Sequence, residues 1–376
     1  MKAAFICSED LWSAGFPDWH PLRPERLRRT YELLGAYRAF DDPASDMVSV
    51  RPITRSDLLL FHTPEYITAV ETLSRGESRA LGLRYGFIPQ ETPPFAGMYE
   101  IEGLKASGSL IAAQLVAQRE VDVAFNFSGG MHHAGPAHAS GFCIFNDPAI
   151  AIQWLVRQGF RVAYVDIDAH HGDGVQNAFY DTDQVLTISL HQAGMMFFPG
   201  TGFPEEVGED AGYGYSINVP FLAGSDEKLM LWAFRQVVPS LVGQFAPDVL
   251  VTQLGVDGHY RDPLPLLGLT TRGYAAMIEE LATLAGRAAG WVALGGGGYD
   301  IDVVARAWTL AYGVMSGQEF SNDLPAEYAA RYGPGHLHDE DGPALVEPRV
   351  ADRTRGYVER VLETLRALTG DVWRWD

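Results

Sequence analysis

Hydrophobic residues along this chain fall into short continuous runs that alternate with helical patterns. The runs are typical of strands buried on both faces, and in the segments between them apolar residues recur every three or four positions. Between 24 and 37, for example, Leu27, Tyr31 and Leu34 share one face. The alternation predicts an α/β fold with a mostly parallel sheet and helices on both faces. The predicted strands are 3–7, 121–127, 161–168, 184–191, 215–220, 247–255 and 291–296, and the predicted helices are 24–37, 103–119, 148–157, 226–243, 272–288 and 303–316.

The end of the chain has a different pattern. Residues 318–348 are polar and rich in proline, glycine and acids, which predicts an excursion over the surface. Residues 352–368 then return to helical periodicity and predict an amphipathic C-terminal helix.

Composition narrows the possible classes of function. The 376 residues carry a net charge of -20, and such an acidic surface repels phosphate backbones, which argues against a nucleic-acid partner. The same charge attracts cationic ligands such as lysine-bearing segments. Only two cysteines occur, Cys7 and Cys143, so neither a disulfide framework nor a cysteine zinc cluster is expected. Without a signal-peptide pattern or an apolar stretch of ~20 residues, we expect a cytoplasmic protein with no membrane partner.

Polar clusters follow four of the predicted strands. They read SGGMHHAG after 121–127, DIDAHHGDG at the end of 161–168, GVDGHYRDP after 247–254 and GGGGYD after 291–294. In open parallel sheets, ligands bind beyond the carboxyl ends of the strands. Four clusters in the same relative place therefore predict one composite site.

The cluster DIDAHHGDG offers metal ligands. If the extended backbone persists, Asp166, Asp168 and His170 point to the same side. Aspartate and histidine in this spacing are plausible ligands, although a solvated turn with a helix N-cap also fits this cluster taken alone. A catalytic zinc site uses three protein ligands, and Asp257 in QLGVDGH is the candidate for the third.

Two adjacent histidines and two remaining aspartates suggest acid–base chemistry. His132 and His133 can be metal ligands or general bases, and a base needs a partner that orients its second ring nitrogen. Asp166 and Asp173 remain once the metal has its ligands, so two His/Asp dyads are expected.

Tyr299 follows four glycines. This run lacks both the glycine spacing and the following helix of a dinucleotide site. The glycines allow the backbone to approach a ligand closely, and a phenol there can donate to a developing oxyanion. A buried core aromatic is the alternative interpretation.

With these residues assembled, the sequence resembles the zinc-dependent histone deacetylase family, and most of all its bacterial acetoin-utilisation branch. The resemblance implies an arginase-like three-layer α/β fold with about eight strands, a single domain over 1–376 and a catalytic core of about 8–317. The implied activity is hydrolysis of N-ε-acetyl-lysine in proteins. The matching stretches, in family order, are HPLRPERLRRTYELL, GGMHHAGPAHASGFCIFND, VAYVDIDAHHGDGVQNAFYDTDQVLTISLH, FFPGTG, YSINVP, QLGVDGHYRDPLPLLGLT and LGGGGYDIDVVARAW.

The resemblance implies roles for individual residues. For the chemistry it implies Asp168, His170 and Asp257 as ligands of one Zn²⁺, dyads of His132 with Asp166 and of His133 with Asp173, and Tyr299 polarising the acetyl carbonyl. For the substrate it implies a tunnel at Gly141, Phe142 and Phe198, a rim at Leu264, and an acetate pocket at Arg23, Arg26 and Cys143. For structural K⁺ or Na⁺ it implies one site at Asp166, Asp168, His170, Ser189 and Leu190, and another at Phe179, Thr182, Val185 and Tyr215.

Two positions depart from the family pattern. The acid that grips the substrate backbone is usually aspartate, whereas the stretch PQETPPFAG has Glu91. Leu264 stands where polyamine-specific relatives carry an acidic gatekeeper, which argues against a charged polyamine substrate.

Other functions remain open from the sequence. An arginase-type ureohydrolase needs a second acid two residues before Asp257, where this chain has Gly255. A non-catalytic acetyl-lysine binder would lack a ligand, a dyad member or the tyrosine. A deacetylase of small acylated amines, including acetylpolyamines, would use the same site. The bacterial branch points to metabolic enzymes as partners, such as an acetylated acyl-CoA synthetase, and an Asp2His site also accepts Fe²⁺ or Co²⁺.

Overall fold

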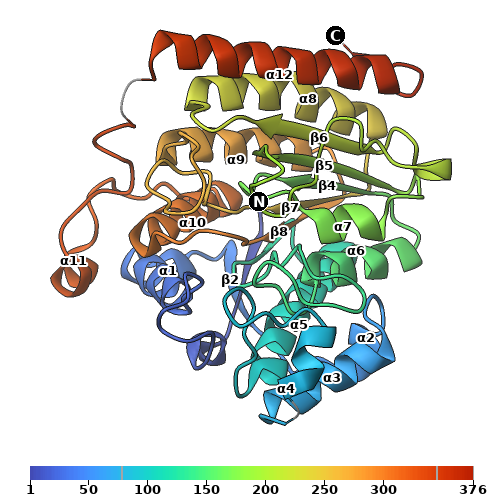
Figure 1. Ribbon diagram of the computed structural model, residues 1–376. Helices are drawn as coiled ribbons and strands as arrows, with labels where there is room; N and C mark the ends of the chain where they lie inside the picture. The colour runs from blue at the N-terminus through green and yellow to red at the C-terminus, as the bar shows by residue number, and fades with distance from the viewer. Residues whose placement is uncertain (78, 344–345, 376) are drawn as a thin grey trace.

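Seven of the predicted apolar runs form strands, and an eighth strand completes one parallel sheet (Figure 1). This computed structural model describes residues 1–77, 79–343 and 346–375. The strand order is β2-β1-β3-β8-β7-β4-β5-β6, and every neighbouring pair is parallel. The predicted fold class is therefore confirmed. The strands are β1 Ala3–Cys7, β2 Ser45–Ser49, β3 Val123–Asn126, β4 Val162–Asp166, β5 Val185–Gln192, β6 Ser216–Phe221, β7 Val249–Gln253 and β8 Gly290–Leu294.

Strand β2 was not among the predicted strands. It lies at one edge of the sheet and pairs only with β1, with Ser45 opposite Ala3. Its sequence SDMVS lacks an apolar run because much of the strand faces solvent, and Met47 is 55% exposed. An edge strand of this kind gives no clear pattern in the sequence.

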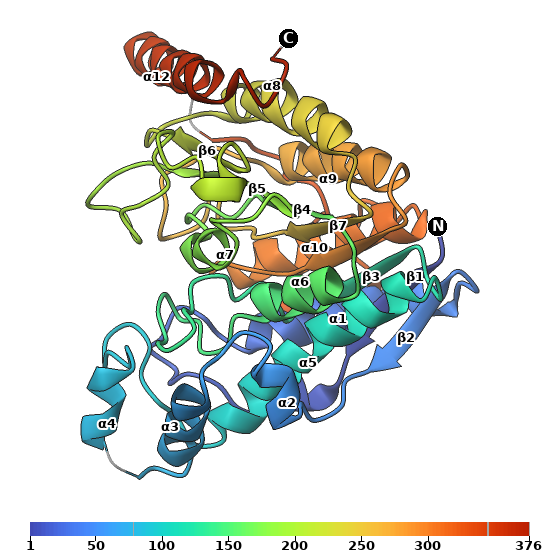
Figure 2. The same ribbon diagram turned by 90° about the vertical axis from the view of Figure 1, so that its right-hand side faces the viewer.

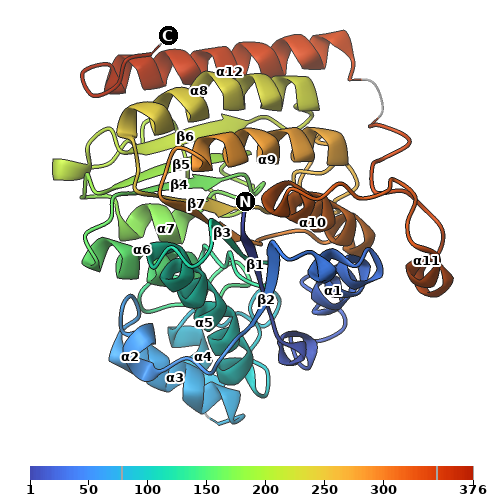
Figure 3. The ribbon, with the colours of Figure 1, turned by 180° about the vertical axis from the view of Figure 1, so that it is seen from behind.

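Side chains of the sheet alternate between two cores, which makes the molecule three layers deep. On β1, Ala3, Phe5 and Cys7 join one core, whereas Ala4 and Ile6 join the other. Helices α1, α8, α9, α10 and α12 cover the first face, and α5, α6 and α7 cover the second (Figures 1 and 3). The bounds are α1 Glu25–Ala36, α5 Met98–Ala117, α6 Asp147–Arg157, α7 Asp173–Ala178, α8 Glu227–Phe245, α9 Thr271–Ala285, α10 Ile301–Ser316 and α12 Pro348–Thr369.

Three short helices that the sequence patterns did not indicate support the loops on one side of the site. They are α2 Arg55–Leu58, α3 Pro64–Ser74 and α4 Arg79–Arg84, and they gather at the end of the molecule opposite α12 (Figure 2). Their core includes Tyr66, which donates a hydrogen bond from its hydroxyl to Ile144 O at 2.7 Å. The segment that follows His132 and His133 therefore rests on this third core.

The predicted surface excursion is partly ordered by contacts with the body of the protein. It contains helix α11 Ala326–Tyr332, and Tyr328 and Leu337 pack with Leu33 and Ala305 in a small separate cluster. Residues 344 and 345 of the predicted excursion lie outside the described residues. The predicted C-terminal helix is present as α12, which lies along α8 (Figure 3). Among the described residues, no helix has the length and apolar character of a membrane span.

Candidate metal centre and active site

The four polar clusters of the sequence follow strands that are neighbours in the sheet. Strands β3, β8, β7 and β4 are consecutive in the strand order, and all run in the same direction. Their carboxyl ends therefore lie along one edge, where ligands bind in parallel sheets. The structure brings together the predicted metal ligands, dyads and tyrosine at this edge.

The three predicted metal ligands converge, although strand β4 ends before two of them. Because β4 ends at Asp166, Asp168 and His170 lie in the following loop, not on an extended strand as predicted. His170 Nδ1 is 2.8 Å from Asp257 Oδ2 and 3.2 Å from Asp168 Oδ1. All three residues are buried, and their possible ligand atoms lie within 4.8 Å of one another. This group could hold a single metal ion.

Hydrogen bonds from the protein hold the other carboxylate oxygens of this group. Asp168 Oδ2 accepts from Gln253 Nε2 at 2.6 Å and from Gly297 N at 2.7 Å. Asp257 Oδ1 accepts from Ala169 N at 2.8 Å. Each carboxylate is thereby held through one oxygen and turns the other oxygen toward His170. Hydrogen bonds of this kind orient the ligands of metal sites.

Two carboxylates and an imidazole in a buried site shift one another's pKa. Burial raises the pKa of Asp257 to about 6, and the neighbouring Asp168 carboxylate adds to the rise. Burial lowers the pKa of His170, but the two carboxylates outweigh it and raise that pKa to about 10. A divalent cation can take the place of this proton, because ligands bind metals in their deprotonated form. Two carboxylate oxygens and one imidazole nitrogen fit zinc.

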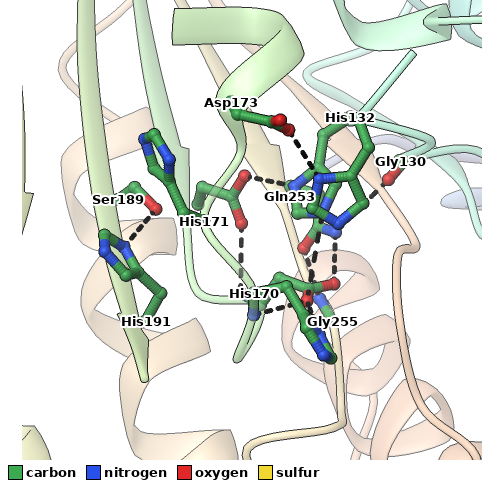
Figure 4. A network of polar contacts seen from close by, with 12 residues as sticks. Gly130, His132, His170, His171, Asp173, Ser189, His191, Gln253 and Gly255 are labelled. Atoms are coloured by element: carbon green, nitrogen blue, oxygen red, sulfur yellow. Dashed lines mark hydrogen bonds and ion pairs between the residues drawn. The ribbon is translucent and has the colours of Figure 1, made fainter. Parts of the chain in front are cut away.

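Both predicted His/Asp dyads are formed beside the candidate metal ligands. Figure 4 shows His132 and Asp173, one residue of each dyad, near His170. His132 Nδ1 lies 2.7 Å from Asp166 Oδ2, and His133 Nδ1 lies 2.7 Å from Asp173 Oδ1. The Nε2 atoms of the two histidines are only 3.0 Å apart. Each aspartate fixes the orientation of its imidazole and leaves Nε2 directed toward the other ring.

The two histidines differ in how strongly they hold a proton. Burial lowers the pKa of His132, but the carboxylates of Asp166 and Asp168 outweigh it and raise the pKa to about 9. Burial and the neighbouring His132 lower the pKa of His133 to about 4. At neutral pH the pair therefore combines one acid with one base, the arrangement that proton transfer in both directions requires.

Tyr299 is placed by the glycine run and by one buried acid. A Cβ at Gly297 would overlap the Asp257 carboxylate, so only glycine allows this loop to pass so close to the metal ligands. Tyr299 N donates to Asp262 Oδ2 at 2.8 Å. Burial and the nearby Asp257 carboxylate raise the pKa of the Tyr299 phenol well above its usual range. The phenol thus keeps its proton and can donate it in a hydrogen bond.

A family model described as "Histone deacetylase domain" matches residues 20–315. The chain belongs to the histone deacetylase family. The acetoin utilization protein AcuC of Bacillus subtilis is 41% identical over 335 residues, which cover 88% of this chain and 86% of that protein. Histone deacetylase B of Dictyostelium discoideum is 35% identical over 98% of this chain and 87% of its own length.

Solved structures extend the likeness to three dimensions. The crystal structure of an HDAC homolog from Aquifex aeolicus superposes with a TM-score of 0.85 at 32% identity, covering 98% of this chain and all of that one. A crystal structure of an HDAC homolog complexed with SAHA gives a TM-score of 0.84. The family and the fold that the resemblance implied are confirmed.

In this histone deacetylase chain, the residues predicted to form the tunnel lie against the His/Asp dyads and Tyr299. The Phe198 ring is 4.9 Å from that of His133 at 88°, and the Phe142 ring is 5.8 Å from that of Tyr299 at 84°. A Cβ at Gly141 would overlap the His133 ring and come within 2.7 Å of Phe198. All three predicted tunnel residues are therefore next to the dyads or the tyrosine.

Glu91 has a different partner from the one the resemblance implied. Its carboxylate accepts a hydrogen bond from Gly141 N, and the neighbouring Thr92 Oγ1 accepts one from Phe142 N at 3.0 Å. Gly141 and Phe142 both have positive φ angles, 54° and 68°, which few non-glycine residues adopt. Glu91 and Thr92 thus stabilise the backbone of the tunnel loop, whereas a grip on the substrate by Glu91 stays a prediction.

Of the three residues predicted for the acetate pocket, one lines a small inner cavity and a second lies beside it. Its volume is about 20 Å³, room for about one water-sized molecule, and Cys143 and Tyr299 are among its lining residues. Arg26 is buried and donates to Gly296 O at 2.6 Å, beside the cavity. Arg23 instead faces solvent and pairs with Glu25 at 2.9 Å, so the structure does not bring it to the pocket.

The predicted cation sites lie at different places along β5, one in its second half and one at its start. Ser189 is the register partner of Asp166 on β4, which places Ser189 and Leu190 next to the first dyad. The other group is at the start of β5, where Val185 begins the strand, and Thr187 N donates to Tyr215 O at 2.9 Å. Phe179 and Thr182 belong to the turn that precedes this strand. Both sites stay predictions.

Several supporting residues were not singled out from the sequence. Besides Gln253, they include Asp262, which accepts from Leu264 N at 3.0 Å as well as from Tyr299 N. Asp339 of the excursion accepts from Thr271 N at 2.8 Å and lies 2.8 Å from His259 Nε2, which ties the tail to the loop of Asp257. A polar amide inside the apolar run PDVLVTQLG was the one signal available for Gln253.

Proposed function

We propose that this protein is a zinc-dependent deacetylase that hydrolyses the acetyl amide of N-ε-acetyl-lysine in proteins, releasing acetate and the free lysine side chain. The observation that carries the proposal is the position of the two His/Asp dyads and Tyr299 around one buried Asp168, His170 and Asp257 group. Asp168, His170 and Asp257 would hold the zinc ion. When bound, zinc supplies Lewis acidity, which lowers the pKa of water to about 7 and polarises a carbonyl group.

The residues of the chain supply proton transfer and orientation. His133 Nε2, with Nδ1 fixed by Asp173, accepts the proton of the attacking water, and the protonated histidine pair returns a proton to the leaving lysine amine. The Tyr299 phenol donates a hydrogen bond to the oxygen on which negative charge develops. Phe142 and Phe198 bury the methylene groups of the lysine side chain and exclude water.

Two competing functions fit the site less well. A two-metal ureohydrolase needs a carboxylate at position 255, but even a Cβ at Gly255 would overlap the Asp168 carboxylate. A non-catalytic binder would not require both dyads and the tyrosine. Deacetylation of small acylated amines remains the second candidate, because the same groups would perform it. The similarity to acetoin utilization proteins supports a metabolic enzyme, such as an acetylated acyl-CoA synthetase, as the substrate.

The first experiment measures release of free lysine amine from a fluorogenic acetyl-lysine peptide. Metal-stripped protein is compared with the same protein after one equivalent of zinc per chain, and an acetylated diamine is assayed in parallel. We expect turnover of the peptide only after zinc is restored. Absence of turnover with zinc bound would contradict the proposal, and faster turnover of the acetylated diamine would favour the second candidate.

A further inference from the structure

Two loops beside the tunnel expose apolar side chains to solvent. Met196 is 100% exposed, Met195 82%, Leu266 68% and Leu264 38%. We call these four residues the apolar lip. Large apolar side chains gathered at the surface mark interaction sites more often than they serve the fold. Within the described part of the chain, Met195 and Met196 belong to none of the hydrophobic cores.

The lip is built onto the catalytic site. Directly after the two methionines, the Phe197 ring stacks on the ring of the metal ligand His170 at 4.9 Å and 12°, and Phe198 contacts His133. Phe197 and Phe198 anchor the loop against the site, so the exposed methionines that precede them lie at the mouth of the proposed tunnel. We expect residues that flank an acyl-lysine in the tunnel to pass next to them.

A hydrogen bond joins the two loops of the lip. Leu266 N donates to the side chain of Gln192 at the end of β5 at 2.6 Å, just before the loop that carries the methionines. On the other loop, Leu264 N is held by Asp262, the residue that also fixes Tyr299 N. The two segments of the lip therefore meet at Gln192, and each is tied to a residue of the proposed active site.

The chemistry of the lip selects the kind of side chain that can lie on it. The segments 193–199 and 263–267 read AGMMFFP and PLPLL, without a charged residue, in a chain of net charge -20. The adjoining Asp262 is buried and already accepts hydrogen bonds from Leu264 N and Tyr299 N. A lysine or arginine on these two segments would therefore lose water without gaining a carboxylate from them, which disfavours it. Apolar side chains would bury area, and flexible methionines adapt to several shapes.

We infer that the lip binds apolar side chains next to the acylated lysine, so the preferred substrates are acyl-lysines in apolar segments and not in basic tails. The inference rests on the proposed function, because it assumes that the acyl-lysine enters the tunnel. The proposed function does not specify which residues flank the acyl-lysine, and the lip supplies this sequence preference.

The test compares kcat/KM for three acetyl-lysine peptides of equal length, flanked by Leu and Phe, by Ser and Gly, or by Lys and Arg. An acetyl-lysine amide without flanks normalises each enzyme variant. For wild type we expect kcat/KM about ten-fold higher with apolar than with polar flanks, as burial of one or two side chains provides. The double variant M195S/M196S should reduce this ratio to nearly one. Leu266→Ser, on the other loop, should also reduce the ratio of kcat/KM between apolar and polar flanks. This single variant tests the lip if the double variant does not fold.

The control is Met47→Ser, which removes another exposed methionine, on edge strand β2 at the far side of the sheet. It should keep the wild-type ratio. Equal kcat/KM for all flanks, a preference for basic flanks, or an unchanged ratio in the lip variants would overturn the inference. The inference would also be overturned if wild type showed no flank preference but formed a dimer in sedimentation experiments, and the lip substitutions abolished that dimer. No turnover even of the unflanked amide would instead reject the proposed function.

Discussion

Replacing Asp173 by asparagine tests the second dyad with little disturbance of the metal ligands. Asp173 begins the short helix α7 and accepts no hydrogen bond from the metal group, whereas Asp166 also accepts from Tyr164 and from the backbone of Asp168. The Asp173 carboxylate is 2.7 Å from His133 Nδ1, and burial of His133 keeps water from replacing it. Asparagine preserves the shape and removes the charge that stabilises a protonated His133.

The expected loss follows from the strength of this one interaction. A hydrogen bond to a charged partner contributes about 1.5–3 kcal/mol, so kcat for the acetyl-lysine peptide should fall about 10- to 150-fold. Zinc content, measured by atomic emission after dialysis, should stay at the wild-type level. Asp183→Asn, an exposed acid shortly after the same helix, is the matched control and should leave kcat unchanged. A kcat within two-fold of wild type at equal zinc content would refute the role of this dyad.

Three further predictions concern the phenol, the metal support and a buried histidine. Tyr299→Phe should lower kcat about 100- to 1000-fold, the usual loss for one oxyanion donor, without loss of zinc, and a rate equal to wild type would contradict its role. Gln253→Leu removes a donor to Asp168 Oδ2 and should weaken zinc binding about 10- to 100-fold in a competition titration with a chelator; unchanged affinity would show that Gly297 N suffices. Burial lowers the pKa of His62 to about 3. Below pH ~6.5 the unfolded chain therefore binds a proton at this histidine that the folded chain does not. The free energy of unfolding should then drop by about 1.4 kcal/mol per pH unit toward pH ~4. Urea unfolding of His62→Gln, whose amide oxygen can still accept from Asn146 N, should show a shallower pH dependence than wild type, and an identical slope would exclude His62 as the source.

The buried strands of this fold can be predicted well from the sequence, whereas its edge strand β2 and its short helices cannot. Strands covered on both faces must be continuously apolar, which is why β1, β3 and β4 to β8 are visible as runs. Strand β2 can be recognised only in the structure, from its pairing with β1. Asp46 and Met47 face solvent, so the sequence has no apolar run there. Helices α2 to α4 are short, and their burial comes from tertiary contacts that no local periodicity records.

For the site, the sequence places residue types at strand ends but not their hydrogen-bond partners. The convergence of Asp168 and His170 with Asp257 follows from the parallel order of β4 and β7, so it could be predicted. Whether the Glu91 carboxylate turns to a substrate or to Gly141 N depends on loop conformation, which spacing does not determine. Arg23 and Arg26 likewise differ only through packing, because one stands before helix α1 and the other on its buried side.

The position of helix α12 has a consequence for the solubility of the protein. Strand β6 is the last strand of the sheet and pairs with β5 on one side only (Figure 1). Helix α12 packs next to it and buries Val358, Val361 and Leu365 in the first core. An uncovered edge strand offers unpaired backbone groups to the same edge of another molecule. A chain shortened before Pro348 would keep every residue proposed to act in catalysis and yet expose this edge and the apolar faces around it. Removal of the C-terminal helix is therefore expected to promote edge-to-edge aggregation, so a shortened protein for crystallisation or assay should retain it.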